Sequence, residues 1–301
     1  MKPVILIAGP TASGKSGLAI QLALQTNGEV INADALQVYS DLKVISARPS
    51  AEEMQGIPHH LFGHVDGSHR YSTGQWLRQA CTVITDVLAR GKLPIVVGGT
   101  GLYFKALTKG LAEVPPVNTR PAADYLECKG IAALRELAEA VDPAAAARVL
   151  GDDPQRLMRI VSVAQETGKP LSLWQSATRP IVPPGFWTSA VLLPPRNLLY
   201  ERINARFDSM VERGGLDEIH ALAARGLPSD LPVMRAIGAK TILAYLSGEL
   251  SLEKGIDLAK RDTRRFAKRQ MTWFRGQASD WPVIGTPFER EEFISQILSE
   301  L

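Results

Sequence analysis

Residues 9–16 read Gly9-Pro10-Thr11-Ala12-Ser13-Gly14-Lys15-Ser16 and match the pattern G-x-x-x-x-G-K-[ST]. This stretch follows the apolar run Val4-Ile5-Leu6-Ile7 and precedes a segment with helical periodicity that ends near Asn27-Gly28. Between a strand and a helix, such glycines let backbone N–H groups surround phosphate oxygens, and the helix N-terminus adds partial positive charge. Lys15 can reach a terminal phosphate, and Ser16 can ligate a magnesium ion shared with a diphosphate. The motif predicts a phosphate site without naming the compound.

Strand and helix patterns alternate beyond this loop. Glu29 to Asn32 and Pro94 to Val97 are buried-strand candidates. Between them an amphipathic helix, with Gly91 as its C′ residue, carries the apolar positions Trp76, Ala80, Ile84, Val87 and Leu88. This alternation predicts an α/β fold with a parallel sheet, in the form of a P-loop NTPase-like core.

The pattern changes in the middle of the chain. Residues 115–121 contain three prolines, and helical segments then dominate from about Ala122 to Gly168. Thr188 to Leu193 returns as a further strand candidate, followed by helices. We therefore predict a catalytic core made of residues 1–114 and 188–301, interrupted by a helical insertion domain at 115–187.

Positive charge is concentrated near the C-terminus although the formal net charge is only +3. We expect the last helix to run from about Leu252 to Gly276. It carries Lys260, Arg261, Arg264, Arg265, Lys268, Arg269 and Arg275 against the single acidic residue Asp262. Such a cluster suits a polyanionic partner, although a solvated basic helix face has the same composition.

Cysteine content and hydropathy exclude several classes of protein. Cys81 and Cys128 are far apart and lack the spacing of a zinc site or a disulfide framework, which favours a reducing cytoplasm. No apolar run approaches the roughly 20 residues that cross a bilayer. We expect a cytoplasmic protein without a membrane partner, and nothing in the sequence requires more than a monomer.

A second glycine turn follows the strand at Pro94 to Val97. A nucleotide hydrolase or kinase usually places a magnesium-organising Asp after a later strand, whereas this strand ends in Gly98-Gly99-Thr100-Gly101. Thr100 could donate to the bridging or leaving oxygen of a diphosphate, or could cap the following helix. Asp34, at the end of the second strand candidate, could act as a general base or magnesium-water ligand, or could cap the segment that follows.

His59 and His60 form the remaining candidate for metal binding. Adjacent histidines point in different directions, and no third ligand is suitably spaced. A structural or positioning role is therefore favoured.

Taken together, these motifs resemble the bacterial tRNA dimethylallyltransferases, also called tRNA isopentenyltransferases. The resemblance extends from Ile5 to about Trp281. It depends on GPTASGKS (9–16), INADALQVY (31–39), GIPHHL (56–61), VVGGTGLYFKAL (96–107), DPQRLMR (153–159), TGKPLS (167–172), RAIGAK (235–240) and TRRFAKRQMTWFR (263–275).

The resemblance implies transfer of a dimethylallyl group from dimethylallyl diphosphate to N6 of the adenosine just 3′ of the anticodon, position 37. It implies catalytic roles for Lys15, Asp34, Thr100 and Arg235, with Asp34 as the base. It also implies that the diphosphate and Mg²⁺ are held by Gly9, Pro10, Thr11, Ala12, Ser13, Gly14, Lys15 and Ser16, with Ser16 on the metal. The implied tRNA contacts are Asp34, Ala35, Leu36, Gln37, Thr100, Arg120, Gln155, Arg156, Leu157, Met158, Arg159, Arg235 and Lys240, of which Gln155 to Arg159 meet the anticodon stem-loop.

The chain departs from the family pattern at several positions. Ala35 replaces the usual Ser, Ile45 stands where the family has Gly, and Ala239 stands where it has Tyr. Two other functions remain open from the residues alone. A small-molecule P-loop kinase that binds ATP would explain residues 9–16, and a decayed tRNA-binding homologue would explain the basic helix.

Overall fold

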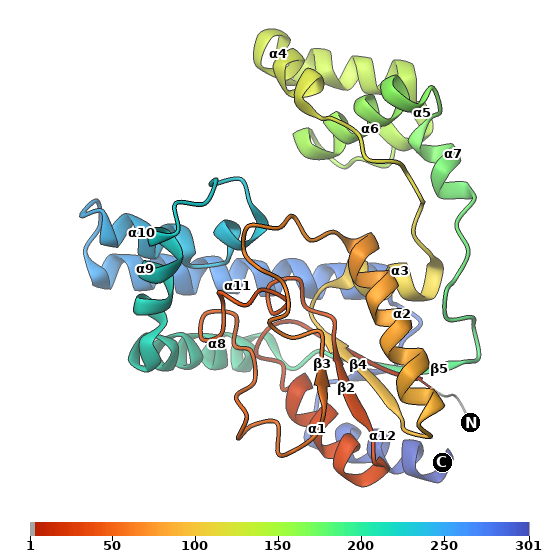
Figure 1. Cartoon of the computed structure of the whole chain (residues 1–301), viewed down its shortest axis with the longest axis vertical. Helices are drawn as coiled ribbons and strands as arrows, with labels where there is room; N and C mark the ends of the chain where they lie inside the picture. Colours follow the sequence, from red (N-terminus) through yellow and green to blue (C-terminus); the bar gives the residue numbers. More distant parts are fainter. Residues whose placement is uncertain (1–3, 301) are drawn as a thin grey trace. The chain divides into compact units, whose positions relative to one another are not determined.

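The computed structural model describes residues 4–300. Figure 1 shows a parallel sheet with helices packed on its faces within residues 4–108 and 182–300. The strand order is β3-β2-β4-β1-β5-β6, and every neighbouring pair is parallel. The strands are β1 (Val4–Ala8), β2 (Glu29–Asn32), β3 (His59–His60), β4 (Pro94–Gly98), β5 (Trp187–Leu192) and β6 (Val283–Ile284). The predicted α/β class and parallel sheet are confirmed.

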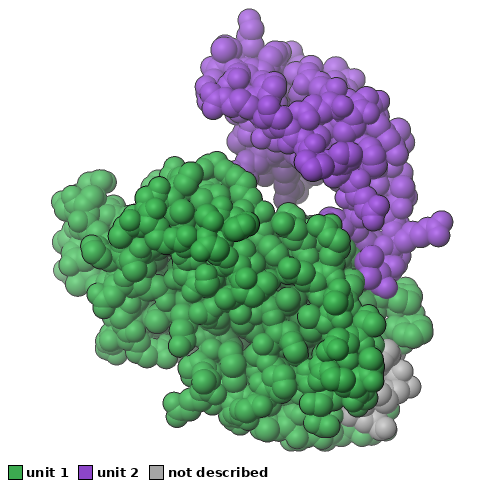
Figure 2. Space-filling model, viewed as in Figure 1, with its two compact units in different colours: residues 1–108, 182–301 green, residues 109–181 purple. Residues whose placement is uncertain are grey.

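Contacts divide the chain into two compact units, which Figure 2 colours separately. Unit 1, whose described residues are 4–108 and 182–300, holds the sheet and ten of the helical segments. These are α1 (Lys15–Thr26), α2 (Thr73–Ala89), α3 (Gly101–Lys109), α8 (Arg196–Met210), the π-helix η1 (Val211–Gly215), α9 (Leu216–Ala224), the 3₁₀ helix η2 (Pro232–Arg235), α10 (Ala239–Leu246), α11 (Leu252–Gln277) and α12 (Pro287–Glu300).

Unit 2 spans residues 109–181 and contains only helices among its regular elements. They are α4 (Arg120–Val141), α5 (Pro143–Ala146), α6 (Pro154–Thr167) and α7 (Leu171–Ser176). The sequence pattern placed this insertion at 115–187, whereas the compact unit begins and ends earlier. The N–H of Val182 donates to the carbonyl of Leu107, which ties the chain to unit 1 before β5 begins.

The central strands of the sheet are buried on both faces, as is typical of a parallel sheet. β1, β2 and β4 are buried at every residue. Alternate strand residues such as Ile5, Ile7 and Ile95 pack with α1 and α12 in one hydrophobic cluster. On α2, Trp76 is fully buried and its indole N–H donates to the carbonyl of Asn32 at 2.7 Å. These contacts fix the carboxyl ends of the strands, from which the loops described below emerge.

Three details differ from the sequence predictions. α11 is not the last helix, because α12 follows it. β3 and β6 were not predicted, because two residues are too few to show a periodic pattern. On α2 the other predicted core positions are buried, but Leu88 is 36% exposed. Within residues 4–300, no helix combines the length and hydropathy needed to span a membrane.

Candidate active site

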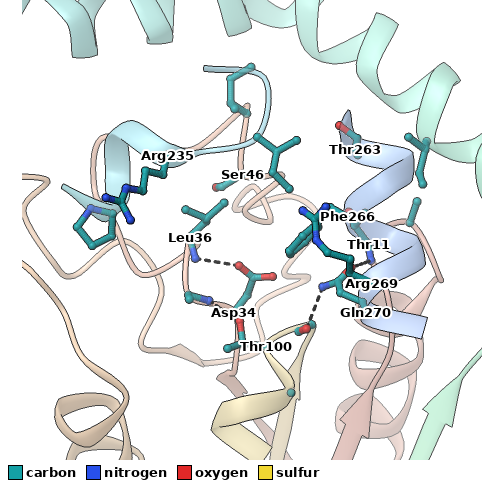
Figure 3. Close-up of a pocket in the computed structure, with 18 of the residues that line it drawn as sticks. Thr11, Asp34, Leu36, Ser46, Thr100, Arg235, Thr263, Phe266, Arg269 and Gln270 are labelled. Atoms are coloured by element: carbon teal, nitrogen blue, oxygen red, sulfur yellow. Dashed lines mark hydrogen bonds between the residues drawn. The ribbon is translucent and has the colours of Figure 1, made fainter. Parts of the chain in front are cut away.

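A cavity of about 650 Å³ opens in unit 1 among the loops that follow β1, β2 and β4. Carboxyl ends of parallel strands are where α/β proteins generally bind ligands. Helices α8 and α11 supply much of the remaining wall, and Figure 3 shows the α11 side chains beside those of the loops. Of the predicted site residues, the cavity is lined by Thr11, Ala12, Asp34, Ala35, Leu36, Thr100 and Arg235. Its apolar surface includes Ile203, Phe207, Met210, Phe266 and Trp273.

The phosphate loop leads directly into α1, which begins at Lys15. Gly14 precedes it with a φ of 90°, a left-handed conformation that glycine adopts without strain. The first N–H groups of the helix have no partner within the helix and can bind an anion. The hydroxyl of Ser13 is buried and has no hydrogen-bond partner among residues 4–300. An unpaired buried hydroxyl in such a loop fits a bound oxyanion.

Two cations accompany this loop. The ammonium of Lys15 donates to the carbonyl of Pro10 at 3.2 Å. Burial lowers the pKa of Lys15 to about 8; the carboxylate of Asp34 opposes this shift, and the guanidinium of Arg206 adds to it. Burial also lowers the pKa of Arg206, against the effect of Asp34. Among residues 4–300, the guanidinium of Arg206 has no hydrogen-bond or ion-pair partner, so its N–H groups are free to bind an anion in the cavity that it lines.

The carboxylate of Asp34 bonds to the backbone and also lies at the cavity. Its Oδ1 atom accepts hydrogen bonds from the N–H of Leu36 at 2.9 Å and of Gln37 at 3.4 Å. Asp34 therefore caps the segment after β2, which was one of its two predicted roles. The residue also lines the cavity, so capping leaves it available for chemistry there.

Thr100 does not cap α3 through its side chain. Its Oγ1 accepts a hydrogen bond from the N–H of Ala35 at 2.9 Å, and its own N–H donates to the carbonyl of Ala33 at 3.1 Å. Both bonds hold the β4 turn against the loop after β2. Because the hydroxyl oxygen acts as an acceptor here, the hydroxyl proton remains available to a ligand.

Helix α11 fixes the glycine turn from the other side. A Cβ atom at Gly101 would lie 2.2 Å from the ring of Trp273, and one at Gly99 would lie 2.4 Å from Nε2 of Gln270. A side chain at Gly101 would therefore displace the ring of Trp273, and one at Gly99 would displace the amide of Gln270. Gln270 and Trp273 line the same cavity as Thr100.

The loop after Asp34 is held over the cavity by two side chains. Nε2 of Gln37 donates to the carbonyls of Ser46 and Ala47, both at 2.9 Å. The carboxylate of Glu218, on α9, accepts hydrogen bonds from three successive N–H groups, those of Lys43 (2.7 Å), Val44 (2.7 Å) and Ile45 (2.9 Å). Ile45 and Ser46 line the cavity, so these bonds shape its wall.

The remaining predicted residues lie elsewhere. Gln37 and the loop residues Gly9, Pro10, Ser13, Gly14, Lys15 and Ser16 do not line the cavity, although the loop adjoins it through Thr11 and Ala12. Lys240 lines a second hollow. The other predicted tRNA contacts are all in unit 2: Arg120, Gln155, Arg156, Leu157, Met158 and Arg159. Arg120 and Arg156 are exposed, whereas Leu157 is fully buried in the core of the unit and Met158 packs against that core.

Sequence reasoning missed Arg206, Glu218 and Gln270. Two of them carry a signal in their helical spacing. Arg206 lies between the buried residues Ile203 and Phe207, on the apolar face of α8. Gln270 is buried in the stripe of α11 that also includes Ala267, Met271 and Phe274. A polar residue on an apolar helix face indicates a specific partner. Glu218 carries no comparable signal.

No group of three or more His, Cys, Asp or Glu side chains within residues 4–300 could hold a metal ion. His59 and His60 have structural partners, since His59 Nδ1 contacts the carbonyl of Ile57 at 2.8 Å and His60 Nε2 contacts Glu29 at 2.7 Å. A metal held mainly by a ligand's phosphates remains compatible with the loop, because Mg²⁺ is commonly bound by few protein groups together with substrate phosphates and water.

Comparison with known proteins agrees with this geometry. The family model described as IPP transferase matches residues 37–277, and the one described as isopentenyl transferase matches residues 2–62. The tRNA dimethylallyltransferase of Caulobacter sp. (strain K31) is 50% identical over 286 residues, which cover 94% of this chain and 93% of the relative. That of Maricaulis maris (strain MCS10) is also 50% identical, over 289 residues covering 95% and 94%.

Solved structures show the same relationship. The full-length tRNA isopentenylpyrophosphate transferase of Bacillus halodurans is 33% identical with a TM-score of 0.70, covering 99% of this chain and 96% of that one. A eukaryotic dimethylallyltransferase acting on tRNA is 32% identical with a TM-score of 0.83, covering 99% of this chain and 78% of its own. The chain therefore belongs to the IPP transferase family, the tRNA dimethylallyltransferases.

Proposed function

We propose that this protein transfers a dimethylallyl group from dimethylallyl diphosphate to N6 of adenosine 37 in tRNA and releases diphosphate. One observation carries the proposal: Asp34 and Thr100 line the same cavity as Arg206 and as Thr11 and Ala12, through which the phosphate loop adjoins it. A base, a hydroxyl donor and a cationic diphosphate site are the groups that this reaction needs.

The donor side carries the positive charge. The exocyclic amine of adenine is a weak nucleophile, so the reaction needs stabilisation of the departing diphosphate. The ammonium of Lys15, the guanidinium of Arg206 and the N–H groups at the start of α1 can supply it. The Ser13 hydroxyl can donate to a phosphate oxygen, which would satisfy its hydrogen-bonding capacity.

The apolar part of the cavity suits the transferred group. Ile203, Phe207 and Phe266 present hydrocarbon surface beside the polar loops. Positive charge develops on the allyl carbon as the diphosphate leaves, and an apolar wall excludes water that would capture it.

On the acceptor side we assign Asp34 as the group that takes the N6 proton. Its backbone hydrogen bonds orient the carboxylate before any substrate binds. Thr100, fixed through Ala35, can donate its hydroxyl proton toward the bridging oxygen of the leaving group. Preorganised groups of this kind need little rearrangement during the reaction.

Mg²⁺ fits this site as an ion that would be coordinated by both the protein and the diphosphate. The hydroxyl of Ser16 on the first turn of α1 would hold it, together with phosphate oxygens and water. When bound, the ion would neutralise charge on the diphosphate. Lys15, Ser13 and the loop N–H groups would still orient the donor.

Binding of tRNA is proposed for basic surfaces in both units. In unit 1 a hollow of about 280 Å³ shares Arg235 and Arg269 with the main cavity, and Lys240 and Arg265 add further positive charge. In unit 2 the exposed residues Arg120 and Arg156 can contact phosphates of the anticodon stem-loop. The target adenine must leave its stack to reach a cavity of this kind.

The test is transfer of labelled dimethylallyl groups from the diphosphate to bulk tRNA in the presence of Mg²⁺, with γ-labelled ATP as a parallel donor. We expect label in tRNA from the first donor and none from the second. Phosphate transfer from ATP without prenyl transfer would instead identify a P-loop kinase. Salt-sensitive tRNA binding without either transfer would identify a homologue that only binds tRNA.

A further inference from the structure

Gln270 connects the two loops on which the proposed reaction depends. Its Oε1 accepts a hydrogen bond from the N–H of Thr11 at 3.0 Å, and its Nε2 donates to the carbonyl of Gly99 at 2.9 Å. The residue is 6% exposed, and each end of the planar amide has one partner (Figure 3). Thr11 belongs to the phosphate loop and Gly99 to the turn that carries Thr100.

The two hydrogen bonds of Gln270 lie just beyond the paired part of β1 and β4. β1 and β4 pair from Ile5↔Ile95 to Ala8↔Gly98, and the register ends there. Beyond that pair, the segments that follow β1 and β4 form separate loops, so pairing in the sheet no longer sets the distance between them. Gln270 joins them just past the last pair, at Gly99 on one side and Thr11 on the other.

The surroundings of Gly99 show what the spacing controls. A Cβ atom at this residue would lie 2.4 Å from Nε2 of Gln270, 3.3 Å from the carbonyl oxygen of Gly9 and 3.5 Å from Oδ2 of Asp34. The turn therefore lies between the phosphate loop, the amide of Gln270 and the carboxylate assigned as the base. Because the N–H of Thr11 already bonds to Gln270, this N–H is not available to a diphosphate.

We propose that Gln270 is a positioning residue that sets the spacing between the phosphate loop and the Thr100 turn, and so aligns the bound donor with Thr100 and Asp34. The inference depends on the proposed function. An error of about 1 Å in such an alignment can reduce a rate by about 10²-fold. The donor's own binding groups are different ones, namely the loop N–H groups, Lys15 and Arg206.

The first test is Gln270→Leu, which keeps the approximate size of the side chain and removes both hydrogen bonds. Single-turnover transfer should slow on the order of 10²-fold, while the donor dissociation constant, measured by calorimetry, changes by less than about fivefold. Gln296→Leu is the matched control, because Gln296 is exposed on α12 and bonds only within that helix. A rate within about threefold of the wild type would overturn the proposal. So would a loss of donor affinity as large as the loss of rate, since that would assign Gln270 to folding of the phosphate loop.

Gln270→Glu keeps the test decisive if the leucine variant does not fold. An ionised carboxylate still accepts from Thr11 but cannot donate to the carbonyl of Gly99, whereas a protonated one can do both. Burial raises the pKa of a carboxyl group, so the introduced Glu should become protonated as pH falls from about 8 to about 6. The activity of Gln270→Glu relative to the wild type should therefore rise over this range. An activity ratio that does not change with pH would contradict the proposal.

Failure of this inference is separable from failure of the proposed function. If the wild-type protein transfers no dimethylallyl group to tRNA, the proposed function is wrong, and with it the alignment that Gln270 would set. If the wild type transfers the group and Gln270→Leu does so at the same rate, only the inference about Gln270 is wrong.

Discussion

The hydroxyl oxygen of Thr100 accepts a hydrogen bond of 2.9 Å from the N–H of Ala35, across the ends of β4 and β2. This bond leaves the hydroxyl proton for the substrate and attaches the Thr100 turn to the loop that carries Asp34. No side-chain hydroxyl at position 35 is needed for this contact, because the backbone of Ala35 makes it.

Thr100→Val should show how much the hydroxyl contributes to turnover, because valine has nearly the same shape as threonine. It removes the proposed donor to the leaving oxygen and leaves the N–H of Ala35 unpaired, so we expect turnover to fall on the order of 10²-fold. Thr100→Ser keeps the hydroxyl and should retain most of the turnover. Steady-state transfer rates for the two variants measure this, and equal losses in both would argue against a role for the hydroxyl.

Asp34→Asn should distinguish catalysis from capping. The amide oxygen of Asn can still accept the hydrogen bonds of Leu36 and Gln37, but it cannot take the N6 proton at neutral pH. We expect turnover to fall by about 10²- to 10⁴-fold, with tRNA affinity nearly unchanged in a filter-binding measurement. If affinity and turnover fall together, Asp34 is mainly structural.

Donor affinity should depend on pH through Lys15. Its pKa is lowered to about 8, so without donor the side chain loses its proton above that pH, whereas a bound diphosphate favours the ammonium form. Donor binding then takes up a proton above about pH 8, and affinity should fall by up to about tenfold per pH unit. Calorimetric titrations from about pH 7.5 to about pH 9.5 measure this.

The matched control is Lys15→Arg, whose guanidinium keeps its charge throughout that range. Its donor affinity should vary much less with pH. Lys15→Ala should weaken donor binding at every pH. An unchanged affinity in the alanine variant would count against the assignment of the loop to the diphosphate.

Glu218→Gln should loosen the segment from Lys43 to Ser46, of which Ile45 and Ser46 line the cavity. An amide cannot accept from all three N–H groups that the carboxylate now pairs, and hydrogen bonds to a charged group contribute about 1.5–3 kcal/mol. Amide hydrogen exchange of Lys43, Val44 and Ile45 should speed up by at least about tenfold, and the KM for donor should rise. Glu212→Gln, on the exposed surface of the neighbouring π-helix, is the control. Unchanged exchange in Glu218→Gln would contradict the assigned contact.

Glu29→Gln should destabilise the fold without touching the cavity. The side chain of Glu29 is 1% exposed and pairs with Arg90, with Lys92 at 2.9 Å and with His60 at 2.7 Å. Loss of a buried charge in such a network costs about 3–5 kcal/mol of unfolding free energy, measured by urea denaturation at neutral pH.

The difference in unfolding free energy between the wild type and Glu29→Gln should also depend on pH. Hydrogen bonds from Arg90, Lys92 and His60 hold the pKa of Glu29 below its ordinary value of 4.5 despite burial. The carboxylate therefore stabilises the fold above pH 4.5, and this contribution is lost as pH falls through the lowered pKa. The gap between wild type and variant should narrow in acid; a constant gap would show that the charge is not responsible.

Residues close to a local motif could be predicted from the sequence, and residues from distant segments could not. The phosphate loop, Asp34 and Thr100 each follow a strand whose apolar run is visible in the sequence. Because parallel strands have their carboxyl ends at the same edge of the sheet, these residues can be predicted to lie close together. Arg206, Glu218 and Gln270 lie on helices and are more than 100 residues beyond these loops in sequence. Their placement depends on how α8, α9 and α11 pack, and no local periodicity encodes that packing.

The most direct test of the account is to react the wild-type protein with labelled dimethylallyl diphosphate, Mg²⁺ and two synthetic anticodon stem-loops. They differ only in having adenosine or guanosine at position 37. The account predicts N6-dimethylallyladenosine in the nucleoside digest of the first, with diphosphate released in equal amount, and no labelled nucleoside in the second. Absence of label from both, or equal label in both, would contradict it.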